Sequence, residues 1–124
     1  MSNHILIKSF TAGAAINAFR IVKFSAAETV VLAAAATDNL LGVCGDVSPA
    51  AGERCDTVLT GITMVEAGAA IAIGSFVTSD AVGRCVLAAP AAGVNNRVVG
   101  VNLDAASAAG DVVRVLLEPG VMQG

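Results

Sequence analysis

Short apolar runs separated by turn residues recur along the chain and predict β-strands. The runs are rich in Val, Ile and Thr, which pleated strands favour. The alanines at 33–36 could continue a helix, but the turn cluster at 37–39 follows them, so we interpret them as a strand end and a loop. The pattern predicts strands over residues 20–24, 29–33, 40–44, 54–62, 75–79, 84–88, 97–103 and 111–117.

One segment of the sequence occurs twice: residues 40–59 recur as residues 98–117, at an offset of 58. Upstream of this segment the best offset is 55, and the difference is an insertion near Pro90. Alanine matches carry little weight in this alanine-rich chain, so the other matched pairs are the informative ones. They include Gly42 with Gly100, Asp46 with Asp104, Gly52 with Gly110 and Leu59 with Leu117. The sequence therefore predicts an all-β fold. We expect a small barrel or sandwich, β-clip-like or β-tulip-like, built from two tandem modules about a pseudo-twofold axis.

The predicted organisation is a single β domain over residues 11–124, with repeats at about 11–61 and 67–120. Residues 1–10 precede the first repeat and have no counterpart in this alignment. Ile5, Ile7 and Phe10 give that stretch an apolar character. It is either an arm that adds a strand to the sheet edge of a neighbouring molecule or an ordinary first strand that closes its own barrel. The sequence leaves both alternatives open.

Composition adds an expectation of self-association. The chain has 124 residues, of which 56% are hydrophobic and 14% charged, with four Phe as the only aromatic residues. One copy has few large side chains for its core, so an apolar surface completed by a second copy is expected. The net charge is −3 and the basic residues are scattered, which argues against nucleic-acid binding. The most apolar stretch is interrupted by Glu66 and by glycines, which argues against a membrane span.

No constellation of residues points to catalysis. His4 is the only histidine, so no Ser/His/Asp arrangement is available away from the N-terminus. Three cysteines without close spacing favour neither a disulfide framework nor a zinc site. Cys55 and Cys85 align with valines and are predicted to be buried free thiols, whereas Cys44 is predicted to be more exposed. We therefore expect no enzyme activity, no metal and no cofactor.

A similarity to biotinyl and lipoyl carrier domains supplies an alternative function. Those domains are flattened barrels of two similar halves, and residues 65–93 are similar to their hairpin region. Their hairpin tip carries a modifiable lysine, whereas the matching tip at 78–84 contains none. The alternative is a non-catalytic binding or carrier-like module of a larger complex.

Nearly the whole chain resembles the capsid cement, or head decoration, proteins of tailed phages. The resemblance is carried by residues 5–24, by the segment from "LLGVCGD" to "CDTVLTGI", by "GSFVTSDAVGRCV" and by the closing "RVVGVNLDAASAAGDVVRVLLEPG". It implies a structural virion protein, made in the host cytoplasm, that binds the outer surface of the assembled capsid and stabilises it. The implied partners are the major capsid protein and further copies of the chain, often as a homotrimer. Ile5, Ile7 and Phe10 are then the candidate contacts with the capsid or a neighbour.

Overall fold

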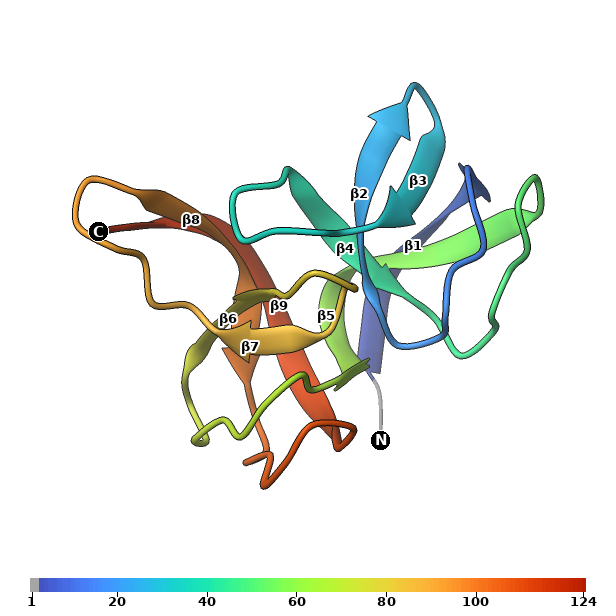
Figure 1. The fold of residues 1–124 in the computed structure, drawn as a ribbon. Helices are drawn as coiled ribbons and strands as arrows, with labels where there is room; N and C mark the ends of the chain where they lie inside the picture. Colours follow the sequence, from blue (N-terminus) through green and yellow to red (C-terminus); the bar gives the residue numbers. More distant parts are fainter. Residues whose placement is uncertain (1–2) are drawn as a thin grey trace.

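The computed structural model describes residues 3–124, with side chains from Ile5 onward, and contains strands and no helix in that range (Figure 1). Each observed strand lies where the apolar pattern predicts one or extends it, apart from the first. The strands are β1 (Asn3–Ala12), β2 (Ile21–Ala26), β3 (Thr29–Leu32), β4 (Leu40–Cys44), β5 (Arg54–Glu66), β6 (Phe76–Ser79), β7 (Cys85–Leu87), β8 (Asn95–Asn102) and β9 (Val112–Gln123).

The strands form one sheet whose strand order is symmetric about its centre. Their order is β1-β3-β2-β4-β5-β9-β8-β6-β7, and a further pairing of β1 with β5 closes the first five strands into a barrel. Outward from the central β5–β9 pair, the order is β5-β4-β2-β3 on one side and β9-β8-β6-β7 on the other. We call residues 3–61 module 1 and residues 62–124 module 2, so that β5 contributes to both. Module 1 occupies the right of Figure 1 and module 2 the left.

The two modules share their strand registers, residue for residue. We compared the β2–β3, β2–β4 and β4–β5 pairings with module 2 by adding 55 or 58 to each residue number. Outside the β-bulges, each pair of facing residues recurs in module 2. The pairs Val22–Leu32, Ile21–Val43 and Val43–Val58 recur as Val77–Leu87, Phe76–Val101 and Val101–Leu116. The prediction of an all-β fold made of two repeated modules is therefore confirmed.

The first strand also has a counterpart, contrary to the expectation from the sequence. β1 pairs antiparallel with the first part of β5, and the second part of β5 pairs antiparallel with β9. The two pairs have the same register. The pairs Phe10–Cys55 and Lys8–Thr57 recur as Val65–Val113 and Thr63–Val115. The repeat therefore begins within β1 and not at residue 11. The identical run Ala-Gly-Ala-Ala-Ile, at 12–16 and 67–71, lies inside the predicted repeat and gives no signal for the earlier part of β1.

Two pairs of glycines explain why this segment of the sequence is repeated. A Cβ atom at Gly42 would collide with the Val58 carbonyl oxygen, and one at Gly100 would collide with the Leu116 carbonyl oxygen, which is the equivalent atom. Gly52 and Gly110 hold φ angles of 84° and 97°, which L side chains rarely adopt. The sequence repeats because the same close backbone approach and the same turn occur in both modules.

The cysteines lie inside the fold. All three are free and buried, which confirms the prediction for Cys55 and Cys85. The prediction for Cys44 is wrong, because its side chain is only 1% exposed. Strand β4 is covered on both faces: Cys44 belongs to the interior of the module 1 barrel, whereas Val43 belongs to the apolar cluster that continues into module 2.

Candidate interaction surfaces

The beginning of β1 is an apolar strand edge. Ile5 is 81% exposed, and Leu6 and Ile7 are each about half exposed. β5 pairs with one edge of β1 along its length, whereas β3 pairs with the other edge only at Thr11 and Ala12. Among the described residues, no strand therefore covers the second edge of β1 over residues 5–10. An open edge of this kind is a template for a further strand.

Phe10 is a core residue and not a surface contact. It is 6% exposed, and its ring packs edge-to-face against Phe24 with the centroids 5.5 Å apart. The Lys8 ammonium lies 4.6 Å from the centroid of the same ring. The contact candidates that remain on the surface are Ile5 and Ile7, to which the structure adds Leu6. Sequence reasoning missed Leu6 because two irregularities near it break the alternation of faces.

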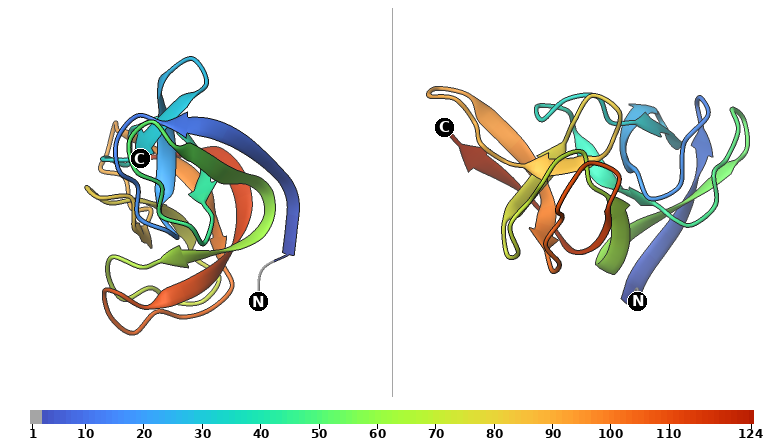
Figure 2. Two further views of the ribbon diagram at one scale, coloured as in Figure 1. Left: turned by 90° about the vertical axis from the view of Figure 1, so that its right-hand side faces the viewer. Right: turned by 60° about the horizontal axis from the view of Figure 1, so that its bottom comes forward.

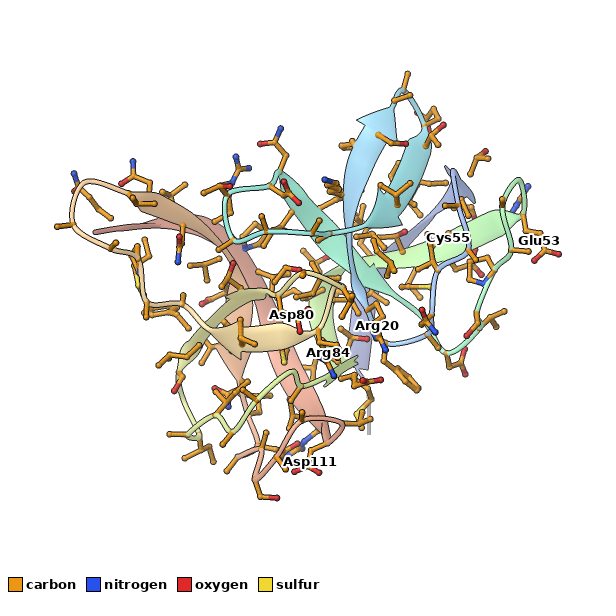
Figure 3. The ribbon with its side chains drawn as sticks, in the orientation of Figure 1. Arg20, Glu53, Cys55, Asp80, Arg84 and Asp111 are labelled. Carbon is orange, nitrogen blue, oxygen red and sulfur yellow. The ribbon has the colours of Figure 1, made fainter. Side chains whose placement is uncertain are left out.

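The segment Phe19–Ile21 of module 1 is inserted into a corner of module 2. The Ile21 N–H donates to the Gly83 carbonyl with an N···O distance of 2.7 Å, and the Glu66 N–H donates to the Phe19 carbonyl at 2.9 Å. Arg20 donates to the Val82 carbonyl at 2.9 Å and to both carboxylate oxygens of Glu66 at 3.3 Å. Figure 3 shows Arg20 beside Arg84 in the middle of the molecule, where the two modules meet. We call this contact the junction.

The equivalent corner of module 1 closes on itself. There the Thr11 N–H donates to the Glu28 carbonyl at 2.8 Å. Beside this bond lies an open groove of about 430 Å³, lined by Ser9, Phe10, Thr11, Glu28, Gly52 and Arg54. Thr11 and Glu28 are the counterparts of Glu66 and Gly83, and their direct bond closes the place that the inserted segment takes in module 2.

Module 2 carries an apolar cleft on its outer face. The cleft encloses about 190 Å³ and is lined by Phe76, Val98, Glu118, Gly120, Val121 and Met122. Phe76 is 49% exposed, whereas its counterpart Ile21 is 0% exposed. The same module position is thus buried at the junction in one module and open to solvent in the other.

The recurring acidic residues hold loops in place. Asp104 accepts hydrogen bonds from the backbone and the guanidinium of Arg114 at 2.8–3.0 Å, and these bonds lower the pKa of Asp104 to about 2. The Asp111 carboxylate accepts bonds from Ser107 and Ala108, which lower its pKa. Glu53, the counterpart of Asp111, accepts a bond from the Ala50 N–H at 2.7 Å. These carboxylates hold loops and strand ends in place through hydrogen bonds.

Two further features are absent from the described part of the chain. No group of three or more His, Cys, Asp or Glu side chains there could hold a metal ion. Within residues 3–124 no helix has the length and apolar character needed to cross a membrane. The side chain of His4 lies outside the described part, although its backbone pairs with Gly61.

Comparison with known proteins agrees with this architecture. The family model described as phage cement protein matches residues 2–117. The N base of head fiber gp8.5 in bacteriophage phi29 is a solved structure with the same fold. It superposes with a TM-score of 0.70 at 18% identity, over 91% of this chain and 93% of that chain. No curated protein matches the chain.

The fold is a duplicated β domain with an open apolar strand edge, and the phi29 head fiber base shares this fold. Because the family match spans almost the whole sequence, the chain belongs to the phage cement protein family. It is therefore a structural protein associated with the phage capsid, as the resemblance at the sequence level implied.

Proposed function

We propose that the protein binds the outer surface of the assembled capsid and stabilises it as a homo-oligomer, for which a trimer is the expected form. The partner on the shell is the major capsid protein, and the bound protein is then a component of the mature virion. The observation that carries the proposal is the apolar edge at Ile5–Ile7, which no described strand covers.

The edge of β1 supplies both affinity and selectivity. Free backbone N–H and C=O groups bind an extended segment of a partner by adding it to the sheet as a strand. The exposed side chains of Ile5 and Ile7 then bury apolar surface against the shell. Complete burial of one such side chain contributes about 1.5–3 kcal/mol.

Self-association turns this modest contact into stable decoration. Each copy binds through one β1 edge, so each contact with the shell is weak. An oligomer reaches several capsid subunits only when the shell holds them at the matching spacing. Linkage then multiplies the affinity by roughly 10²–10⁴, which favours assembled capsids over free subunits.

The role requires no chemistry of its own, and the structure gives the carrier alternative no support. In carrier domains the hairpin tip carries the modifiable lysine. Here the matching tip at 78–84 is held by the junction, where Val82 and Gly83 accept hydrogen bonds from Arg20 and Ile21.

Co-sedimentation with purified capsids tests the proposal. The wild-type protein is expected to pellet with assembled capsids and to stay in solution with dissociated subunits. Ile5→Ser is expected to weaken binding about tenfold or more, because a tenfold change corresponds to about 1.4 kcal/mol. Val47→Ser is the matched control, since Val47 is an exposed apolar residue in the loop before β5.

Deletion of the N-terminal stretch would be a poorer test, because residues 3–11 pair with β5 and help to close the module 1 barrel. A wild-type protein that never pellets with capsids would end the functional proposal. An Ile5→Ser variant that decorates as well as wild type would end only the assignment of the β1 edge.

A further inference from the structure

Two buried thiols of module 1 lie against each other. The Sγ atoms of Cys44 on β4 and Cys55 on β5 are 3.6 Å apart, and both side chains are 1% exposed. The Cys55 sulfur also lies 3.5 Å from the Thr57 hydroxyl oxygen. The third cysteine, Cys85, belongs to the other apolar cluster and takes no part in the contact. The fold thus brings together two nucleophilic groups that are eleven residues apart in the sequence.

The two thiols lie on either side of a loop at one end of the molecule. β4 pairs with β5 as far as Cys44, and one further backbone bond joins the strands, from the Gly45 N–H to the Asp56 carbonyl at 3.0 Å. Residues 45–53 then connect the two strands. This loop lies at the outer end of module 1, away from module 2, in Figure 1 and in the right view of Figure 2. A bond between the two sulfurs would therefore close the base of the loop.

The equivalent position in module 2 is held more firmly. Asn102 is the counterpart of Cys44, and its side chain makes three hydrogen bonds with the backbone at 2.7–2.8 Å. These bonds fix the loop after β8 and the segment before β6. Within the described chain, the Cys44 thiol donates one bond, to the Val47 carbonyl at 3.3 Å. Module 1 therefore has a pair of thiols where module 2 has a network of hydrogen bonds.

A small pocket lies beside the thiol pair. The Val47 carbonyl accepts the bond from the Cys44 thiol, so the sulfur lies directly behind one of the lining residues. A molecule of the size of water or hydrogen peroxide fits in the pocket and needs little opening of the loop to reach the sulfurs. The pocket has a volume of about 120 Å³ and is lined by Gly45, Asp46, Val47, Pro49, Arg54 and Asp56.

Cys55 is the thiol that loses its proton more readily. The Cys44 thiol and the Thr57 hydroxyl are both placed to donate to a Cys55 thiolate, and these contacts lower the pKa of Cys55 although burial opposes them. The same contact between the sulfurs, together with burial, raises the pKa of Cys44. The thiolate is the form of a cysteine that oxidants attack. The Cys55 sulfur is therefore the first target of an oxidant, and Cys44 is placed to react with the product.

We propose that Cys44 and Cys55 are a peroxide-sensitive pair that closes to a disulfide between β4 and β5. The Cys55 thiolate attacks one oxygen of hydrogen peroxide, the O–O bond breaks, and hydroxide leaves and takes up the proton that the thiol lost. The product is a sulfenic acid on Cys55. The Cys44 sulfur then attacks the Cys55 sulfur, and its proton leaves with the hydroxyl group as water. Two thiols are oxidised, and one peroxide is reduced to two molecules of water.

The strands allow the bond to form. A disulfide bond is about 2.05 Å long, so the two sulfurs must approach each other by roughly 1.5 Å. The β4–β5 pairing ends at Cys44, and the loop beyond it can follow this movement. The disulfide would then restrict the unfolded chain and stabilise module 1. Disulfides persist outside cells and are rare in the cytoplasm, so under the proposed function the bond forms after the particle leaves the host.

Mass spectrometry of the full chain tests the thiol chemistry. The reduced protein is treated with hydrogen peroxide, and the remaining thiols are alkylated in denaturant before digestion. The expected product is a linked peptide that joins Cys44 to Cys55, with Cys85 still alkylated. A protein that remains fully alkylated would overturn the proposal. Oxidation of either thiol to a sulfinic acid without formation of the link would also overturn it.

Single variants test the order of the two steps. Cys44→Ser is expected to stop at the sulfenic acid on Cys55, which a cyclic diketone reagent traps as a stable adduct. Cys55→Ser is expected to give roughly tenfold less adduct, because the remaining thiol has a raised pKa. Cys85→Ser is the matched control and should form the same disulfide as the wild type. Equal trapping in Cys44→Ser and Cys55→Ser would overturn the assignment of Cys55 as the first target.

Thermal unfolding tests what the bond does. The oxidised protein is expected to melt about 5 °C or more above the reduced protein, and Cys44→Ser should show no such shift on peroxide treatment. An unchanged or lower melting temperature would overturn the stabilising role. Co-sedimentation separates this inference from capsid binding, because the Ile5–Ile7 edge lies outside the thiol pair. A protein that forms the disulfide but never pellets with capsids would end the proposed function and leave the thiol pair in place.

Discussion

The two modules share their strand registers but differ at the corner where the first strand meets the hairpin. In module 1, β1 pairs with β3 at Thr11 and Ala12, and the barrel closes. In module 2, the corresponding strands meet only at the isolated bridge between Ala67 and Cys85. The segment Phe19–Ile21 occupies the space that this leaves.

The difference shows how one duplicated unit serves two purposes. Where a neighbouring module is present, the corner stays open and takes up the inserted segment, and Ile21 becomes fully buried. Where no neighbour exists within the chain, the corner closes with a single bond and Phe76 stays exposed. The differences between the modules therefore lie where one module packs on the other.

The largest expected loss of stability is at the close backbone approach that both modules share. Gly42→Ala and Gly100→Ala should each destabilise the protein by about 3 kcal/mol, because the added Cβ meets a carbonyl oxygen of the neighbouring strand. Chemical denaturation measures the change. Gly45→Ala is the control, since a Cβ there would lie 3.4 Å from the Asp56 carbonyl oxygen, an ordinary contact. If only one of the two variants is destabilised, the modules are not equivalent at this position.

A smaller effect separates the open corner from the closed one. Gly83→Ala should cost about 2 kcal/mol, because φ is 80° and the Cβ would lie 2.8 Å from the Ile21 carbonyl oxygen. Its counterpart change, Glu28→Gly, removes a side chain from a left-handed conformation and should alter stability by less than about 1 kcal/mol. Thermal unfolding compares the two. Equal losses in both variants would contradict the difference between the corners.

Thiol labelling tests burial in both modules. We expect Cys44, Cys55 and Cys85 to react on the order of 100-fold more slowly in the native protein than in denaturant, because labelling requires local opening. Burial also raises the pKa of Cys85 to about 12, which depletes its reactive thiolate. The contact of Cys44 with Cys55, whose sulfur lies 3.6 Å away, raises the pKa of the Cys44 thiol together with burial. Rapid labelling of Cys44 in the native protein would contradict its burial and support the exposure predicted from the sequence.

The smallest expected effect is on the stability of the protein at low pH. The pKa of Asp104 is lowered to about 2 in the fold, from its ordinary value of 3.8, so its contribution to stability is present above about pH 4. The contribution is lost as the pH falls through 2, and Asp104→Asn should flatten this part of the acid-unfolding curve. Asp46→Asn is the comparison, because the position equivalent to Arg114 holds Asp56 in module 1. Identical acid profiles for wild type and Asp104→Asn would contradict the assigned pairing.

The sequence predicted the strands and the repeat because both follow from local pattern. Gly42 and Gly100 recur since the backbone of each module leaves no room for a side chain, and such a constraint is visible without a structure. The family resemblance was confirmed for the same reason, because its motifs lie in these structural positions.

The contacts between the modules escaped prediction. Alternation assigned Cys44 to an outer face, but β4 has no outer face once module 2 covers Val43. The insertion of Phe19–Ile21 depends on an arrangement of elements far apart in the sequence. Phe10 was named as a candidate contact because it follows Ile5 and Ile7 along an apolar stretch, whereas its side chain is buried in the barrel that the strand closes.

A cryo-electron microscopy map of capsids decorated with the purified protein tests the central claim most directly. The account predicts density for this β domain on the outer surface of the shell, with the Ile5–Ile7 edge of β1 against the major capsid protein. Density that lies inside the shell, or bound protein whose β1 edge faces solvent, would contradict it.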